Sequence, residues 1–142
     1  MRGAVFERRE LVRFGHCDPA GIVYYPRYYE MLNGLVEDWF DQGLGIAFAE
    51  LLGPRRVGLP TVRLETDFRR PSRMGERLQL RLGVVQLGRS SLQLLQHFDG
   101  PDGTRVRFRQ WLVCTSLDSH RPQAFPDDVR AAIEAARESV SG

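Results

Sequence analysis

The chain has 142 residues, of which 42% are hydrophobic and 27% charged, values typical of one globular domain spanning residues 1–142. All 20 basic residues are Arg and face 18 acidic ones, so the net charge of +2 is too small to indicate a nucleic-acid partner. The lack of Lys excludes Schiff-base chemistry and a phosphate-binding P-loop lysine.

Cysteine content and hydropathy predict a compartment. The two cysteines, Cys17 and Cys114, are too few for a disulfide framework and favour a reducing environment. No stretch reaches the roughly 18–20 apolar residues of a membrane span. The first 13 residues contain four Arg and lack the apolar segment of a secretory signal. We therefore expect a cytoplasmic protein without a membrane partner.

The first half of the chain predicts a strand, a loop and a long helix. Ala4–Phe14 mixes apolar and charged residues as an edge strand does, and Gly15–Val23 is rich in turn-forming residues. From Tyr28 onward, apolar residues recur with the i, i+3, i+4, i+7 spacing of an amphipathic helix that needs a surface to cover it. These residues are Tyr28, Met31, Leu32, Leu35, Val36, Trp39 and Phe40.

The predicted ends of the helices follow from proline and glycine. Pro26 suits the first turn of the long helix and Gly43 its exit. A second, shorter helix is expected over Ile46–Leu52, before the Gly53–Pro54 pair. Pro126–Arg137 is typical of a C-terminal helix with two aspartates at its positive end.

The remaining segments predict strands joined by tight turns. Residues 78–84 alternate Leu or Val with other residues, and 100–103 reads Gly-Pro-Asp-Gly, a strong hairpin turn. The expected strands are Leu59–Phe68, 78–84, Leu92–Phe98 and Arg105–Leu117. One apolar helix and one antiparallel sheet favour an α+β fold in which the sheet curls around the helix. No glycine-rich nucleotide-binding motif follows a strand.

The loop before the long helix is the candidate for chemistry. Asp18 lies just upstream of a helix start, whose unpaired N–H groups suit a developing oxyanion. Asp18 could attack a carbonyl polarised by these groups, or deprotonate the attacking water. An Asp-Pro-x-Gly run is equally an ordinary turn. Cys17 is a rival nucleophile or a core residue, and His16 could orient Asp18 or simply fill the loop.

Other polar residues carry weaker signals. The three His lie far apart and lack the spacing of metal ligands, and His97 and His120 are interpreted as a structural and a surface residue. Arg89, in the turn before residue 92, and the Arg residues of 69–73 could bind phosphate or form a solvated rim.

Residues 14–26, Phe-Gly-His-Cys-Asp-Pro-Ala-Gly-Ile-Val-Tyr-Tyr-Pro, resemble the signature of the 4-hydroxybenzoyl-CoA thioesterase family of hotdog-fold proteins. Supporting similarities at 58–60, 67–71 and 88–91 extend the resemblance over residues 8–117. The resemblance implies a hotdog fold. It also implies homodimers with joined sheets, often paired into homotetramers, with active sites at the dimer interface and no metal or redox cofactor.

On the matching positions, the resemblance implies that Asp18 is the catalytic carboxylate and that the backbone N–H of Tyr25 binds the thioester oxygen. Three positions depart from the pattern of relatives. His16 stands where a close relative type carries an acid, and Asn33 where the 4-hydroxybenzoyl enzyme has an Asp that grips the ring hydroxyl. Arg89 is the only cation in what would be the phosphate-binding turn.

Together with Tyr24, which is compatible with an aromatic acyl group, the residues His16, Asn33 and Arg89 are the candidate substrate-binding positions. The leading hypothesis is an aromatic acyl-CoA thioesterase. A thioesterase for aliphatic acyl-CoA or acyl-carrier protein, and a non-catalytic acyl-CoA-binding module, remain open. A dehydratase is disfavoured because this loop offers only one His.

Overall fold

The computed structural model describes residues 1–141, and its centre is one antiparallel sheet of five strands in the order β1-β4-β5-β6-β3. Hairpins join β4, β5 and β6, while β1 and β3 form the two edges. The strands are β1 (Ala4–Leu11), β3 (Thr61–Phe68), β4 (Arg77–Leu87), β5 (Ser91–Gly100) and β6 (Gly103–Val113).

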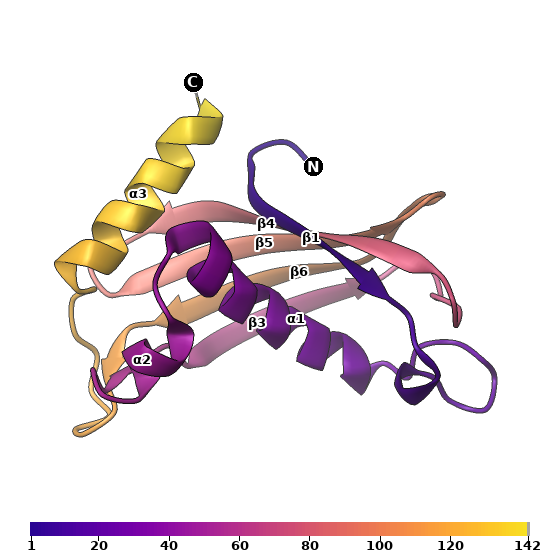
Figure 1. The fold of residues 1–142 in the computed structure, drawn as a ribbon, viewed down its shortest axis with the longest axis horizontal. Coiled ribbons are helices and arrows are strands. Elements are labelled where there is room, and N and C mark those ends of the chain that lie inside the picture. The colour runs from indigo at the N-terminus through magenta and orange to yellow at the C-terminus, as the bar shows by residue number, and fades with distance from the viewer. Residues whose placement is uncertain (142) are drawn as a thin grey trace.

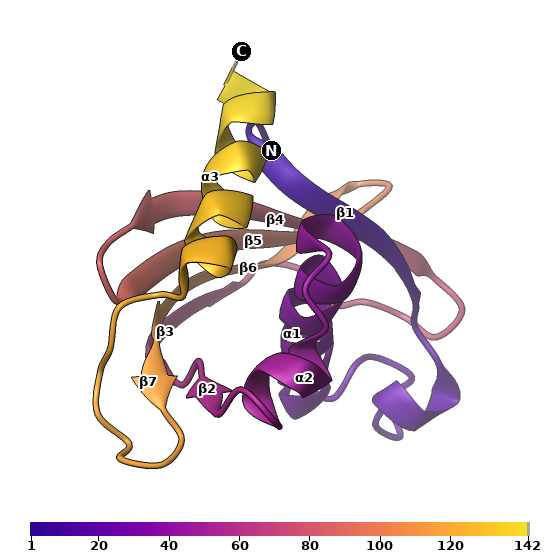
Figure 2. The same cartoon turned by 60° about the vertical axis from the view of Figure 1, so that its left-hand side comes forward.

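A long helix, α1 (Pro26–Asp38), lies across one face of this sheet (Figure 1). Its apolar stripe is buried, as the periodicity requires. Turning the molecule shows the sheet curving around the helix (Figure 2). The inward residues of the central strands complete the core, where the rings of Phe98 and Phe108 meet at 5.1 Å between centroids. The α+β prediction is therefore confirmed.

Smaller elements close the ends of this layer pair. The short helices are η1 (Phe14–His16) and α2 (Phe48–Leu52), and the two-stranded sheet pairs β2 (Val57–Gly58) with β7 (Thr115–Ser116). The C-terminal helix α3 (Asp127–Ser141) packs against β1 and against η2 (Trp39–Leu44), the π-helical segment that continues α1. None of the helices within residues 1–141 has the length and apolarity needed to cross a membrane.

The predicted exit of the long helix at Gly43 is wrong. The helix continues as a π-helical segment, η2 (Trp39–Leu44), and ends at Gly45, whose φ of 70° is left-handed. A Cβ at Gly43 would come within 2.8 Å of the Trp39 ring. Gly43 therefore permits close packing inside the helix and does not end it.

Strand boundaries also differ from the predicted ones. The first strand ends at Leu11 and not at Phe14, which belongs to η1. The strand expected from Leu59 begins at Thr61, because Pro60 has no N–H to pair. The strand expected over Arg105–Leu117 stops at Val113, and its last part becomes β7, paired with β2 in the second sheet. The C-terminal helix runs beyond its predicted end to residue 141.

Candidate active site

The Asp18 loop, defined here as residues 17–23, folds back on itself before α1 begins. The amide of Asp18 donates to the carbonyl of Ile22 at 3.0 Å, and the amide of Gly21 donates to the carbonyl of Asp18 at 2.9 Å. Gly21 has a φ of 78°, a left-handed conformation that a side chain would strain. The loop is thus a closed turn, in which Asp18 occupies the first position.

The Asp18 carboxylate makes one local contact. Its Oδ1 accepts a hydrogen bond from the amide of Ala20 at 2.8 Å, which is an Asx turn. Within residues 1–141, no ion pair involves this carboxylate. It is half-buried and borders a hollow of about 330 Å³. The residues lining this hollow are Gly15, Cys17, Asp18, Pro19, Tyr24 and Arg27.

The start of α1 lies beside this hollow and presents an amide that is unpaired within residues 1–141. The amide of Tyr24 donates to the carbonyl of His16 at 2.8 Å, and Pro26 has no N–H. The amide of Tyr25, at the N-cap, has no backbone acceptor among the described residues. Because a helix start carries partial positive charge, this amide suits an oxyanion. The loop therefore offers a carboxylate and a donor on neighbouring segments.

The other two candidates, which directly precede Asp18 in the chain, have different partners. The Nδ1 atom of His16 accepts a hydrogen bond from the amide of Arg13 at 2.9 Å. The Cys17 thiol donates to the Arg13 carbonyl at 3.4 Å. No hydrogen bond links His16 to Asp18 or to Cys17 in the part of the chain that the structure describes. The geometry thus gives no support for a Cys17–His16 pair or for His16 orienting Asp18.

A second segment, residues 71–76, supports the Asp18 loop from the sheet side. The amide of Val23 donates to the Ser72 carbonyl at 2.9 Å, and the amide of Met74 donates to the Gly21 carbonyl at 3.2 Å. The hydroxyl of Tyr28, on α1, donates to the Ser72 Oγ at 2.8 Å in a buried position. Burial raises the pKa of Tyr28, which keeps the phenol protonated as a donor.

A buried ion pair anchors this support. Arg105, only 4% exposed, donates to both carboxylate oxygens of Glu76 at 2.9 Å and to the Pro71 carbonyl at 3.0 Å. The Arg105 guanidinium, together with the Arg73 amide, lowers the pKa of Glu76 to about 2. Bidentate pairing of this kind fixes geometry strongly. It therefore holds residues 71–76, and through them the loop, against β6.

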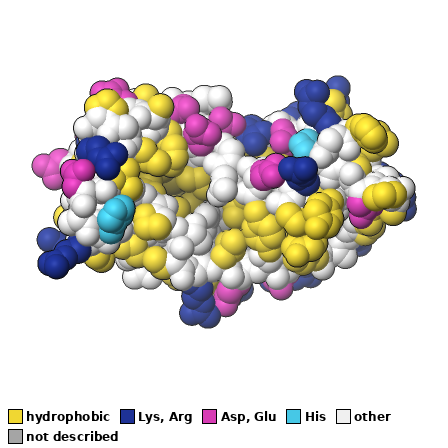
Figure 3. Space-filling model, turned by 90° about the horizontal axis from the view of Figure 1, so that it is seen from below, with side chains coloured by type: hydrophobic (Ala, Val, Ile, Leu, Met, Phe, Trp, Pro, Cys, Tyr) yellow, Lys and Arg dark blue, Asp and Glu magenta, His cyan; other side chains and the backbone are white. Residues whose placement is uncertain are grey.

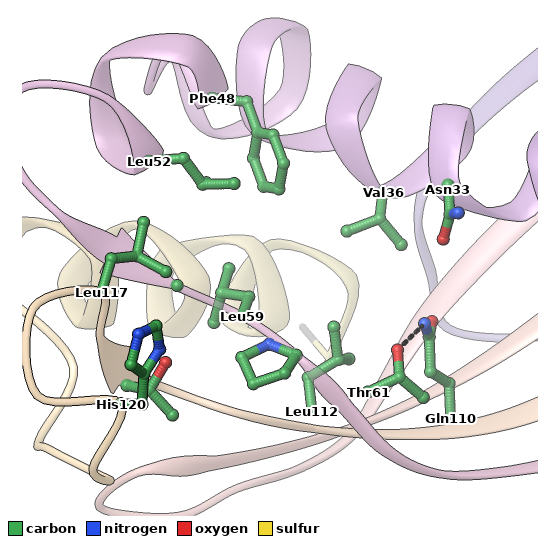
Figure 4. Close-up of a pocket in the computed structure, with 13 residues that line it drawn as sticks. Asn33, Val36, Phe48, Leu52, Leu59, Thr61, Gln110, Leu112, Leu117 and His120 are labelled. Carbon is green, nitrogen blue, oxygen red and sulfur yellow. Dashed lines mark hydrogen bonds between the residues drawn. The ribbon is translucent and has the colours of Figure 1, made fainter.

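A larger cavity of about 440 Å³ lies further along α1, between that helix, α2 and β3 (Figure 4). Most of its lining is apolar. Asn33 and His120 also line it, so His120 is both an exposed residue and a wall of this cavity. The lining residues are Asn33, Val36, Phe48, Leu52, Gly58, Leu59, Pro60, Thr61, Gln110, Leu112, Thr115, Leu117 and His120.

Two lining residues belong to a polar chain that the sequence reasoning missed. Gln96, fully buried on β5, donates through Nε2 to Gln110 Oε1 at 2.7 Å, and Gln110 donates to the hydroxyl of Thr61 at 3.0 Å. The alternation of inward and outward residues along β5 and β6 could have indicated this polar chain. Gln96 and Gln110 occupy inward positions between apolar residues, where a polar side chain is unusual.

The predicted site residues fall into three places. Asp18, Tyr24, Tyr25 and His16 lie together at one end of the molecule. Asn33 is eight residues beyond Tyr25 on α1, about 12 Å at the rise of a helix, and lines the larger cavity. Arg89 lies in the β4–β5 turn at the opposite end from the Asp18 loop (Figure 1). One chain therefore does not bring all of them together.

Hydrophobic side chains gather on the face that carries α1 and β3 (Figure 3). Tyr25 is 58% exposed and its ring meets Phe68, at the end of β3, at 6.1 Å in an edge contact. Val62 and Leu64, on the same edge strand, are also exposed. This apolar face borders both the Asp18 hollow and the larger cavity.

Comparisons with known proteins agree with this fold. The sequence model of the Thioesterase-like superfamily matches residues 12–133. A 1,4-dihydroxy-2-naphthoyl-CoA hydrolase from Synechococcus elongatus is 31% identical over 128 residues, which cover 87% of this chain and 91% of that protein.

Two solved structures share the architecture. A 1,4-dihydroxy-2-naphthoyl-CoA thioesterase from Synechocystis superposes with a TM-score of 0.82 at 22% identity, covering 90% of this chain and 94% of that one. A gentisyl-coenzyme A thioesterase superposes with a TM-score of 0.80 at 25% identity, covering 88% and 99%.

A sheet curled around one long helix is the hotdog fold that the solved structures share, and the matches to the superfamily and to the hydrolase from Synechococcus elongatus make this protein a thioester hydrolase. The chain belongs to the Thioesterase-like superfamily, and within it to the acyl-CoA thioesterases.

Proposed function

We propose that this protein hydrolyses the thioester of an aromatic acyl-CoA, with Asp18 and the amide of Tyr25 as its catalytic groups. The observation that carries the proposal is that, among the described residues, the Asp18 carboxylate has no ion pair and the Tyr25 amide at the nearby start of α1 has no backbone acceptor. The relatives support an aromatic acyl group, because their names specify dihydroxynaphthoyl-CoA and gentisyl-CoA. The narrower similarity to 4-hydroxybenzoyl-CoA thioesterases rests on residues 14–26.

The chemistry has two routes through the same geometry. In the first, an Asp18 oxygen attacks the thioester carbonyl, the CoA thiolate leaves, and water hydrolyses the resulting anhydride. In the second, Asp18 takes a proton from water as that water attacks the carbonyl, and the thiolate leaves with a proton. In both routes the negative carbonyl oxygen of the intermediate accepts a hydrogen bond from the Tyr25 amide.

A second copy of the chain would complete the site. Within one chain, the Asp18 hollow and the larger cavity lie toward opposite ends of α1, which runs alongside the edge strand β3 (Figure 1). A two-fold axis across β3 reverses direction along that strand. It therefore sets the Asp18 loop of one copy beside the larger cavity of the other. The exposed apolar residues of β3 and of the α1 start favour this homodimer, and pairs of such dimers would form a homotetramer.

The remaining candidate residues take roles that follow from their positions. Tyr24 borders the Asp18 hollow and would contact the thioester region, with His16 behind it. Asn33 would face the acyl group inside the larger cavity. Arg89, exposed in its turn, would bind CoA phosphate at a site of another copy.

Three further expectations from the sequence stay proposals: a single domain over residues 1–142, a cytoplasmic location and catalysis without a metal or redox cofactor. The last residue of that domain lies outside the described residues.

Release of free CoA thiol from benzoyl-, hydroxybenzoyl-, phenylacetyl- and medium-chain acyl-CoA tests the proposal. We expect turnover of at least one aromatic substrate, and a fall in kcat of about 10³-fold in Asp18→Asn with an unchanged melting temperature. An Asp18→Asn variant that keeps full activity would overturn the assignment of Asp18. Turnover of aliphatic substrates alone would overturn the aromatic acyl group, and binding of every substrate without turnover would indicate a binding module.

A further inference from the structure

Polar side chains collect at one end of the larger cavity, opposite the end where His120 lies (Figure 4). Asn33 points from α1 toward Gln110 and Thr61, which reach into the cavity from the sheet. Between these ends, the walls are formed mainly by apolar side chains such as Phe48 and Leu112. A group that fills this cavity therefore meets hydrophobic walls along its length and hydrogen-bonding groups at one end.

The polar end is built on two buried amides. Gln96 is fully buried and Gln110 is 2% exposed, and the two join across β5 and β6 through the 2.7 Å hydrogen bond. The Oε1 atom of Gln96 has no partner among the described residues. Because burying such amides costs free energy, and apolar side chains could fill the same core positions, stability alone does not account for them.

The direction of the hydrogen bonds determines whether Thr61 presents a donor or an acceptor to the cavity. Gln96 donates to Gln110, which fixes the carbonyl oxygen of Gln110 toward the core and its amino group toward β3. That amino group donates to Thr61 Oγ1, so the Thr61 oxygen accepts and its own proton stays available. Thr61 Oγ1 has no other partner in the described chain. It therefore presents a donor to the cavity.

We propose that Thr61, oriented by Gln110 and Gln96, determines specificity by donating a hydrogen bond to a polar ring substituent of the acyl group. This inference rests on the proposed function, because it places the acyl group of the thioester in the larger cavity. The substrate class is an aryl thioester with a hydroxyl or oxo group at the end of the ring remote from the thioester, where Thr61 and Asn33 lie. Gln96 and Gln110 act through Thr61 and are positioning residues in this respect.

Thr61 is exposed in the single chain, so its hydroxyl can donate to water. An unsubstituted ring bound in the cavity would displace that water and leave the Thr61 donor without an acceptor. A neutral hydrogen bond of this kind changes binding by about tenfold. We therefore expect the wild-type protein to prefer a hydroxylated acyl group over the matching unsubstituted one by about that factor. The preference should depend on the hydroxyl of Thr61 and not on its methyl group.

The test compares kcat/KM for benzoyl-CoA with kcat/KM for 2-, 3- and 4-hydroxybenzoyl-CoA in five proteins. We expect the wild type to prefer one hydroxylated substrate about tenfold, Thr61→Ser to keep that preference, and Thr61→Val to reduce it to near unity. Thr66→Val is the matched control, since Thr66 is on the same strand but binds the Tyr29 hydroxyl at 3.0 Å and does not line the cavity. Gln96→Met, which removes the donor to Gln110, should lower the preference about threefold.

A second readout separates this inference from the proposed function. Calorimetric binding of the same four thioesters to Asp18→Asn measures the preference without turnover. If the wild type hydrolyses nothing but binding shows the Thr61-dependent preference, the proposed activity fails and the inference stands. A preference that survives Thr61→Val, or a wild type that distinguishes no hydroxylated substrate in either readout, would overturn the inference.

Discussion

Two carboxylates on neighbouring segments have opposite environments. Glu76, in the 71–76 segment, is held by the two terminal nitrogens of the buried Arg105 guanidinium, and its pKa lies near 2. Asp18, in the loop that this segment supports, accepts one hydrogen bond from its own turn and has no ion pair within residues 1–141. The two segments are joined by backbone hydrogen bonds from Val23 and Met74.

The difference shows how the surroundings of a carboxylate determine whether it stabilises the fold or remains able to react. A carboxylate that is saturated by Arg105 stabilises the fold but has lost most of its ability to act as a base or nucleophile. A carboxylate left with open lone pairs contributes little to stability but can react. The 71–76 segment therefore holds the Asp18 loop in place, while the Asp18 carboxylate, the proposed catalytic group, forms no ion pair within residues 1–141.

The largest expected effect on stability comes from removing the cation. Arg105→Met leaves Glu76 partly buried without its partner, and we expect a loss of about 3–5 kcal/mol in the free energy of unfolding, measured by urea denaturation. The double variant Arg105→Met/Glu76→Leu should recover much of this loss, because no charge is left unpaired. Asp18→Asn is the contrasting control, with a change within about 0.5 kcal/mol. Equal losses in Arg105→Met and Asp18→Asn would contradict the comparison.

The second-largest expected effect is a loss of stability in acid, through the same ion pair between Glu76 and Arg105. The folded state lowers the pKa of Glu76 from its usual 4.5 to about 2, so folding is favoured when this group is ionised. Its contribution, about 3 kcal/mol, is complete above about pH 5 and is lost as the pH falls toward 2.

Urea unfolding at intervals between pH 7 and pH 2.5 measures this loss. Glu76→Gln should be less stable at pH 7 and should show a smaller decline with acid than the wild type. The decline should not vanish, because Arg107 and Arg55 also lower the pKa of Asp67 and of Asp128. Parallel curves for wild type and Glu76→Gln would show that the Arg105 pair is not the acid-sensitive element.

The sequence predicted the parts of this comparison that are local. The Asx turn of Asp18 and the helix start after it involve residues close together in the chain, so turn and capping patterns suffice. The helix periodicity likewise identified the buried face of α1. The predicted exit at Gly43 was wrong because the role of this glycine depends on its close packing against the Trp39 ring inside the helix.

Contacts between distant segments were not predictable in the same way. Glu76 meets Arg105 only because β4 and β6 both flank β5, and no local pattern connects residues 29 positions apart. The Gln96–Gln110 pair depends on the register of β5 against β6, in which Gln96 lies opposite Phe108. Alternation could place each Gln on the inner face, but register and the position of β3 were needed to bring Thr61 to them.

The smallest expected effect concerns the contribution of α1 to the link between the 71–76 segment and the Asp18 loop. Two adjacent tyrosines of α1 test it. Tyr28→Phe removes the buried hydrogen bond to Ser72 and leaves the Ser72 hydroxyl without its donor. It should destabilise the protein by about 1–2 kcal/mol. Tyr29→Phe removes a half-buried bond to Thr66, where water can substitute, and should cost less than about 0.5 kcal/mol. The Ser72 carbonyl also accepts a hydrogen bond from the amide of Val23. Of the two variants, only Tyr28→Phe should therefore speed hydrogen exchange at that amide. Equal exchange in the two variants would mean that the 71–76 segment holds the Asp18 loop without help from the helix.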